Sequence, residues 1–245
     1  MRTKTLLIAS AALAAGILTS SAQTYSQNIV GYVVEPLPAG YSIAANPLNG
    51  AVNNSLQNTF NNGDGSFDGN LLLVWTGSKY ATYTFDSTMP QGFADANDIN
   101  SVPAPVLNPG TGFLINNNQG GGTFTNTWTG TVAISSLPGT TTNTIPAGLS
   151  FYASQLPYAG GVETVLNVPS DGSLDGNLLE IPNINGSGAI KGYNTYTFDS
   201  TMPQGFGDAN DLHSVPEPVI PVGGGFFINN NQGGGTFQWV QTLNP

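Results

Sequence analysis

The sequence predicts an all-β protein, built as a tandem duplication of an antiparallel β-sandwich-like or barrel-like unit of about 108 residues. Three observations support this fold class. Short segments of alternating apolar and polar residues lie between Gly, Pro and Asn, while helical periodicity is almost absent. The chain contains 32 Gly and 17 Pro, which indicates many turns. Finally, a long stretch of the sequence occurs twice.

Residues 1–22 have the pattern of a secretory signal peptide. Arg2 and Lys4 precede an apolar stretch over 6–18, and small residues up to Ala22 form a cleavage site. The apolar stretch is about 13 residues long, shorter than the roughly 20 that span a bilayer. We therefore expect cleavage after Ala22 and a secreted protein, extracellular or on the outer cell surface, without a membrane span.

The charge of the mature chain limits its partners. Without the signal peptide it keeps only Lys79 and Lys191 against 14 acidic residues, a formal charge of about −12. Nucleic acids and anionic membranes require a basic patch, so we do not expect them as partners. Because the chain has no Cys, it can form neither disulfides nor thiolate metal sites.

The repeat defines two domains. Residues 80–125 and 193–238 are identical at about three positions in four, and a weaker match continues upstream. The second copy carries about six extra residues near "NINGSGAIKG". After the signal peptide we therefore expect one β-sandwich-like repeat over 23–135 and another over 136–245, with about seven strands each.

Individual strands follow from alternation. In "YATYTF" (80–85), Ala81, Tyr83 and Phe85 share one face, expected to be core, and the alternate face, which begins with Tyr80, is expected to be solvent-exposed. The stretch from Gly112 reads as a hairpin, with a polar turn over 118–122 and a return strand from Thr123.

The chain end raises a question of assembly. The segment "TGTV" (129–132) is expected to double as the opening strand of the second copy, in the place that "IVGYVV" (29–34) has in the first. The second copy has nothing equivalent after its last strand, so we expect either an open sheet edge after Thr236 or a strand supplied from elsewhere. An open edge is a template for pairing with another chain.

All ten Asp residues form repeated pairs, whereas none of the four Glu residues has an acidic counterpart in the other copy. The segments "DGSFDGN" and "DGSLDGN" resemble the first half of a calcium loop, but the acid at its twelfth position is missing and strands flank it, which excludes an EF-hand. A calcium site in a β-loop is one interpretation; Asp-Gly turn chemistry alone is the other. The candidate calcium ligands are Asp64, Ser66, Asp68, Asp86, Asp95 and Asp98 in the first copy and Asp171, Ser173, Asp175, Asp199, Asp208 and Asp211 in the second.

Catalysis has little support. Paired carboxylates could serve glycoside hydrolysis, but two identical active sites in one small chain are uncommon. The only His is His213, which replaces Asn100 of the first copy, and no Cys is available as a nucleophile. We therefore expect no catalytic residues and no enzymatic activity.

Sugar binding would need exposed aromatic rings. The three Trp residues are not repeated at equivalent positions, and most repeated aromatics lie at positions expected to face the core. Tyr80 and Tyr193 are the repeated pair expected to point outward, and they are the candidate glycan-binding residues.

The segments "NIVGYVVEPLPAGYSIAANPLN", "PGTGFLINNN" and "VGGGFFINNN" resemble uncharacterised secreted β-rich proteins of verrucomicrobial and planctomycete-like bacteria, which share VGY, PAGxS and GxGFF motifs. The resemblance implies an exported β-rich protein with no known activity, and its motifs identify no active site. We expect a non-enzymatic secreted or cell-surface structural or adhesion protein that self-assembles through strand edges or binds another extracellular protein. The alternative is a pair of carbohydrate-binding modules, with calcium as the cofactor.

Overall fold

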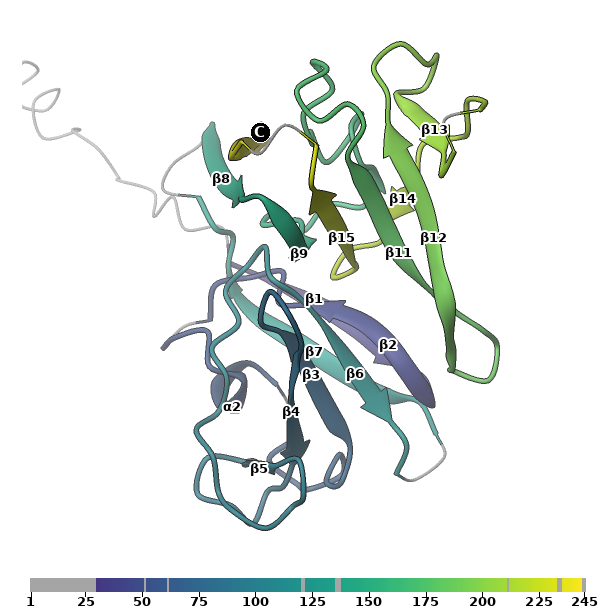
Figure 1. The fold of residues 1–245 in the computed structure, drawn as a ribbon. Helices are drawn as coiled ribbons and strands as arrows, with labels where there is room; N and C mark the ends of the chain where they lie inside the picture. The colour runs from purple at the N-terminus through teal and green to yellow at the C-terminus, as the bar shows by residue number, and fades with distance from the viewer. Residues whose placement is uncertain are drawn as a thin grey trace, which may run out of the picture.

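A computed structural model describes residues 30–50, 52–60, 62–119, 122–134, 138–210, 212–232 and 235–243. The predicted signal peptide and the predicted domain boundary between residues 135 and 136 lie outside the described residues. Nearly all regular structure in the described part is antiparallel β, which confirms the all-β prediction (Figure 1). The one helix of the described residues is a single turn, α2 (Leu56–Thr59), and no described helix is long and apolar enough to cross a membrane.

The first copy, unit 1, has one five-stranded sheet and one two-stranded ribbon. Its sheet has the order β2-β6-β3-β4-β5, and its ribbon pairs β1 with β7, the first and last strands of the unit. The strands are β1 (Val30–Leu37), β2 (Gly40–Ala45), β3 (Leu71–Trp75), β4 (Tyr80–Phe85), β5 (Phe93–Asp95), β6 (Gly112–Asn117) and β7 (Phe124–Thr131).

The second copy, unit 2, repeats this plan. Its five-stranded sheet has the order β13-β12-β11-β15-β9, its ribbon pairs β8 with β16, and two short strands, β10 and β14, pair separately. The strands are β8 (Gly139–Ile145), β9 (Gly148–Ala153), β10 (Gly160–Gly161), β11 (Leu178–Ile184), β12 (Ile190–Phe198), β13 (Phe206–Asp208), β14 (Val219–Ile220), β15 (Gly225–Asn230) and β16 (Phe237–Leu243).

Each unit buries a core between its sheet and its ribbon. In unit 1, Phe113 and Ile115 of β6 and Leu72 of β3 pack with Trp128 of the ribbon, and all four are fully buried. Trp239 is the corresponding anchor of unit 2. Burial of each such side chain stabilises the fold by about 1.5–3 kcal/mol, so these alternating apolar residues account for the two-layer unit.

The two five-stranded sheets pack back to back. Leu114, which lies between Phe113 and Ile115 in β6, faces the other unit and joins Phe151 and Phe227 in a third apolar cluster. The rings of Phe151 and Phe227 stack with their centroids 4.1 Å apart, and the indole N–H of Trp75 donates a 2.9 Å hydrogen bond to the carbonyl of Leu149. The layer order is therefore ribbon, sheet, sheet, ribbon.

This packing corrects the prediction for residues 80–85. Tyr83 and Phe85 lie in the core of unit 1, as expected. The alternate face is not a solvent face, because Tyr80 belongs to the cluster between the units. A sheet covered on both sides has apolar residues on both faces. The alternation within one strand does not distinguish such a sheet from one that has a solvent-exposed face.

The hairpin predicted from Gly112 is wrong, although both of its strands exist. β6 pairs with β2 and β3, whereas β7 pairs with β1 in the other layer, so the connection crosses between layers. The side-chain amide of Asn117 holds this crossing, because it donates to the carbonyls of Leu37 and Gly122. A Gly-rich polar loop suits either connection, and only the packing of both strands decides between them.

The structure also bears on two predictions for the second copy. "TGTV" does not open unit 2: it lies mostly within β7, and β8 is the opening strand. The expected open edge after Thr236 is present on one side of the last strand: β16 pairs with β8 along its whole length, from Phe237 opposite Ile145 to Leu243 opposite Gly139, and its other edge has no strand partner among the described residues.

The extra residues of the second copy lengthen the hairpin between β11 and β12, and this hairpin touches unit 1. The backbone N–H of Tyr41 donates a 2.7 Å hydrogen bond to the carbonyl of Gly188. A methyl carbon built on Gly40 would lie only 2.4 Å from the Cα of Gly188, so two glycines allow the backbones of the two units to approach. The insertion therefore contributes to the contact between the copies.

Candidate functional site

The repeated Asp residues mostly accept hydrogen bonds within their own turns. Oδ1 of Asp86 accepts from the backbone N–H and the hydroxyl of Thr88, at 2.8 and 2.6 Å, and Asp199 does the same with Thr201. The hydroxyl of Thr201 is the main cause of a lowered pKa at Asp199. This is the Asx-turn geometry that short acidic side chains favour.

Asp64 and Asp171 form the same kind of turn with Ser66 and Ser173. The backbone N–H of Ser66 donates to Asp64 at 3.0 Å, and that of Ser173 donates to Asp171 at 2.9 Å. Hydrogen bonds from these serines, the side chain first, lower the pKa of both carboxyls. Both serines, predicted as calcium ligands, thus serve as donors to the carboxylates.

Asp68 and Asp175 connect the two repeated segments of each unit. Asp68 accepts from the backbone N–H of Ser87 at 2.8 Å and from its hydroxyl at 2.7 Å, and Asp175 accepts from Ser200 at the same two distances. Ser87 follows the strand β4, so this carboxylate fixes the loop before β3 against the loop after β4. These two aspartates join loops that are distant in sequence.

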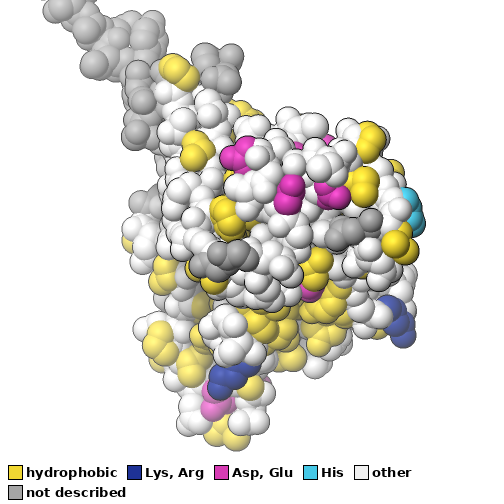
Figure 2. Space-filling model, turned by 45° about the horizontal axis from the view of Figure 1, so that its top comes forward, with side chains coloured by type: hydrophobic (Ala, Val, Ile, Leu, Met, Phe, Trp, Pro, Cys, Tyr) yellow, Lys and Arg dark blue, Asp and Glu magenta, His cyan; other side chains and the backbone are white. Residues whose placement is uncertain are grey.

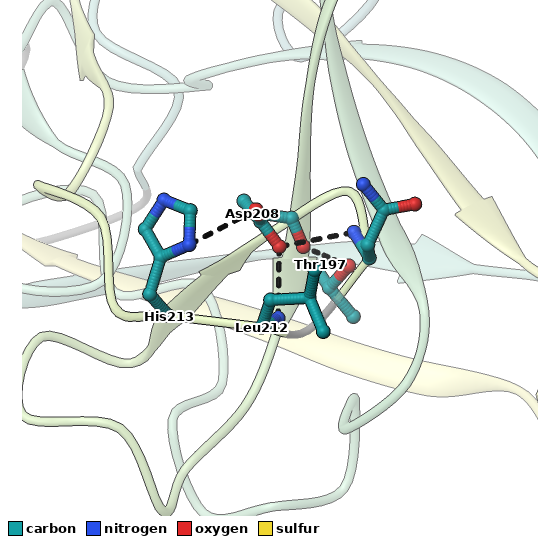
Figure 3. A network of polar contacts seen from close by, with 5 residues as sticks. Thr197, Asp208, Leu212 and His213 are labelled. Atoms are coloured by element: carbon teal, nitrogen blue, oxygen red, sulfur yellow. Dashed lines mark hydrogen bonds and ion pairs between the residues drawn. The ribbon is translucent and has the colours of Figure 1, made fainter.

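Asp95 and Asp208 organise the loops after β5 and β13. Oδ1 of Asp208 accepts from the backbone N–H groups of Asn210 and Leu212, while Oδ2 lies 3.2 Å from Nδ1 of His213 (Figure 3). The backbone N–H of Leu212 is the main cause of the lowered pKa of Asp208. Asp95 accepts from Asn97, Ile99 and Asn100, and the side chain of Asn100 contributes most to its lowered pKa.

Asp98 is a turn residue in this loop. Its φ of 57° lies in the left-handed region, which Asp tolerates better than most residues, and its backbone N–H donates to the carbonyl of Asp95 at 2.9 Å. Its counterpart Asp211 lies outside the described residues. Among the residues that the structure describes, no three Asp, Glu or His side chains come together in a group that could hold a metal ion.

The candidate glycan residues lie in different surroundings. Tyr80 packs edge-on against Trp75, its hydroxyl is buried without a hydrogen-bond partner, and burial raises its pKa above the ordinary value. The expectation that Tyr80 points outward is therefore wrong. Tyr193 is 44% exposed and lies edge-on against Phe227. Tyr32 on β1, which the sequence analysis did not select, is more exposed, at 74%.

Unit 2 has an acidic pocket whose counterpart in the described part of unit 1 is uncharged. Glu163 and Glu217 line a cavity of about 570 Å³ together with Ser200 and Met202. Burial, followed by the nearby charges of Glu217 and Asp175, raises the pKa of Glu163 to about 7. The carboxylate of Glu217 accepts from the backbone N–H and hydroxyl of Thr164. The corresponding pocket of unit 1 is lined instead by uncharged residues that include Leu56, Phe60 and Met89.

A second carboxyl, Glu35, is buried near the contact between the units. The residue is 8% exposed, and Trp128 donates its indole N–H to Oε2 of Glu35 at 2.7 Å. Burial raises the pKa of Glu35 to about 8, against the weaker opposite effect of that hydrogen bond. Glu35 also lines a cavity that extends to unit 2.

Sequence reasoning missed these glutamates as candidate residues. The sequence signal that could have found them is that these glutamates have no acidic counterpart in the other copy. A residue that only one copy has is not required by the fold that both copies share. Figure 2 shows few charged groups on the face in view, where acidic side chains gather in one region and hydrophobic side chains lie below them.

Comparisons with known proteins give no family and no fold relative: no family model, no curated protein and no solved structure matches this chain.

Proposed function

We propose that the protein is a non-enzymatic structural or adhesion protein of the cell exterior, and that it self-assembles through the ribbon of β1 and β7. The observation that carries this proposal is the outer face of that ribbon. Val30, Tyr32 and Val34 alternate along β1 with inward-facing residues, and they are 74%, 74% and 54% exposed.

The opposite strand completes an uncharged face. Thr127 lies opposite Val34, Thr129 opposite Tyr32 and Thr131 opposite Val30. β-Branched and aromatic side chains fit a pleated sheet surface, and charged residues, Lys above all, are the usual protection of an exposed strand. Neither acid nor base lies on this outer face, so the usual protection is missing.

A second copy of the chain is the partner that this face suits best. The mature chain carries a formal charge of about −12, so two copies repel each other over most of their surfaces. The ribbon face offers an approach without carboxylates, and β1 has one edge without a strand partner among the described residues. Exposed apolar patches of this kind commonly mark interaction sites.

Analytical ultracentrifugation of the mature chain over a range of concentrations tests the proposal. We expect reversible association that Tyr32→Lys abolishes, because one ammonium per copy would have to be desolvated in the contact. The control is Ile99→Lys, which replaces another highly exposed apolar residue in a loop. A wild-type chain that stays monomeric at high concentration, or one whose association survives Tyr32→Lys, would disprove self-assembly through this face.

Carbohydrate binding at an aromatic surface is the second candidate. Tyr32 and Tyr193 are the large exposed rings of the described residues, while Trp128 and Trp239 are fully buried. A glycan array compares the wild type with Tyr193→Ala and Tyr32→Ala. Tyr32 lies on the assembly face of unit 1, whereas Tyr193 lies in unit 2, so a loss of glycan binding in Tyr193→Ala distinguishes carbohydrate binding from self-assembly.

A further inference from the structure

The two ribbons differ in which of their strands has an accessible outer edge. Among the described strands, β1 and β7 pair only with each other, and so do β8 and β16. Each ribbon therefore has two edges without a strand partner. Other parts of the chain cover one edge of each ribbon, and the covered edges are those of β7 and β8.

A backbone segment covers the far edge of β7 at its C-terminal end. The N–H of Asn49 donates to the carbonyl of Thr131 at 2.8 Å, and the carbonyl of Asn49 accepts from the N–H of Thr131 at 2.9 Å. In the second copy the equivalent of Asn49 is Pro157, which has no N–H to donate. This pair of hydrogen bonds is therefore not available to β16, the counterpart of β7.

Two side chains cover the far edge of β8. The hydroxyl of Tyr152 donates to the carbonyl of Thr144 at 2.9 Å, and the side-chain amide of Gln155 donates to the carbonyl of Thr142 at 3.2 Å. These carbonyls are two residues apart, which is the spacing at which carbonyls repeat along one edge of a strand. A strand that approached β8 would have to displace both donors.

Substitutions between the copies explain why β1 keeps the edge that β8 loses. By the repeat, β1 corresponds to β8, and Ala44 and Pro47 stand where the second copy has Tyr152 and Gln155. Neither Ala nor Pro has a side-chain donor. Two identical copies would leave the same edge accessible, whereas this chain leaves the first strand of unit 1 and the last strand of unit 2.

Neither of these two strands has the usual protection of a sheet edge. β16 contains no charged residue and no Pro, and its outward-facing Val240 is 44% exposed. In β1 the one acid, Glu35, is buried, and Pro36 lies near the end, so 30–34 has neither a charge nor a Pro. Edges that lack Lys, other charges and Pro are templates for a further strand.

We propose that β1 of one copy pairs edge to edge with β16 of the next copy, which joins the two ribbons into one continuous sheet. This inference rests on the proposed self-assembly, and it names the surface that receives β1. Because the two edges belong to different units, each copy binds two others at once. Such a heterologous contact adds copies into a ring or an open filament and does not stop at a symmetric dimer.

Sedimentation velocity of the full mature chain and of two lysine variants tests the proposal. The wild type should grow beyond a dimer as its concentration rises. Tyr32→Lys and Val240→Lys should each stay monomeric under the same conditions, because a lysine on an edge strand opposes pairing. An equimolar mixture of the two variants should form a dimer and nothing larger, since β16 of the first and β1 of the second are its only pair of unaltered edges.

Thr142→Lys is the matched control. Thr142 lies opposite Val240 in the same ribbon and is also exposed, but it belongs to β8, whose far edge is covered. This variant should associate as the wild type does. Thermal unfolding shows whether all three variants fold as the wild type does.

Three results would overturn the inference and leave the proposed function standing. Association of Val240→Lys as strong as that of the wild type would show that the unit 1 ribbon binds its own counterpart. A loss of association in Thr142→Lys equal to that in Val240→Lys would place the contact on the whole outer face of the unit 2 ribbon. A mixture of Tyr32→Lys and Val240→Lys that forms no dimer would show that the edges do not pair. A monomeric wild type, in contrast, would disprove the proposed function and this inference together.

Discussion

The indole N–H of Trp128 donates a 2.7 Å hydrogen bond to Oε2 of Glu35, and this carboxyl is buried without a cationic partner among the described residues. Its pKa is raised from 4.5 to about 8. The folded state therefore binds a proton that the unfolded state has lost between these two pH values. The contribution of Glu35 to stability is fully present below about pH 4.5 and is lost as the pH rises through about 8.

We predict that the free energy of unfolding decreases from about pH 5 to about pH 9, and that Glu35→Gln removes most of this decrease. The Gln side chain keeps an acceptor for Trp128 and does not titrate. Glu35 accounts for at most about 5 kcal/mol of this decrease, for a pKa shift of this size. Urea unfolding at several pH values measures it. Glu163, whose pKa is about 7, also titrates in this window, so Glu163→Gln is the control. An unchanged pH slope in Glu35→Gln would contradict the prediction.

The substitution Gly40→Ala tests whether the close approach of the two units is needed for stability. The φ of Gly40 is +91°, and an added methyl carbon would lie 2.4 Å from the Cα of Gly188. Gly77 has the same φ of +91°, but a methyl carbon there meets nothing within 4 Å. We predict that Gly77→Ala costs about 1–2 kcal/mol, the penalty of the left-handed backbone alone. Gly40→Ala should cost about 1–3 kcal/mol more, because the two units must separate.

The measurement for Gly40 and Gly77 is chemical unfolding of both variants under identical conditions. Equal losses of stability would show that the contact between Gly40 and Gly188 does not constrain the units in solution.

The sequence predicts individual layers better than it predicts how they meet. Alternation correctly placed Tyr83 and Phe85 in the core of unit 1. Of the two interpretations of the Asp-rich segments, turn chemistry describes the hydrogen bonds that the structure has at Asp64 and Asp86. The position of Tyr80 could not be predicted, since a strand with an apolar residue on its second face has the same pattern whether water or another sheet covers that face.

The candidate site shows a similar limit. Repetition drew attention to the aspartates, because identical copies are easy to recognise, and the structure uses them to build loops. The raised pKa of Glu35 is caused by burial, which depends on residues far away in sequence such as Gly223 of unit 2, and the hydrogen bond from Trp128 partly opposes it. No local pattern around Glu35 contains that information.

The aspartates that join two loops should matter more for stability than those that only close a turn. Asp68 accepts from Ser87 twice and also from the side-chain amide of Asn62, whereas Asp64 closes only its own turn with Ser66. We predict a loss of about 2–3 kcal/mol for Asp68→Ala and a clearly smaller loss for Asp64→Ala. Thermal unfolding of the two variants provides the comparison, and an equal loss in both would contradict it.

Calcium removal is the last test. Oxygens of Asp86, Asp95 and Asp68 already accept hydrogen bonds from N–H and hydroxyl groups, with which a bound cation would compete, and among the described residues no three acidic or His side chains come together to hold an ion. We therefore predict that a chelator such as EDTA leaves the melting temperature unchanged. A ligand that binds only the native state stabilises it by about 2.7 kcal/mol at a free concentration 100 times its dissociation constant, and so raises the melting temperature. A drop of several degrees on adding EDTA, reversed by excess calcium, would instead establish calcium binding. Asp95→Asn and Asp208→Asn would then identify the unit that holds the ion.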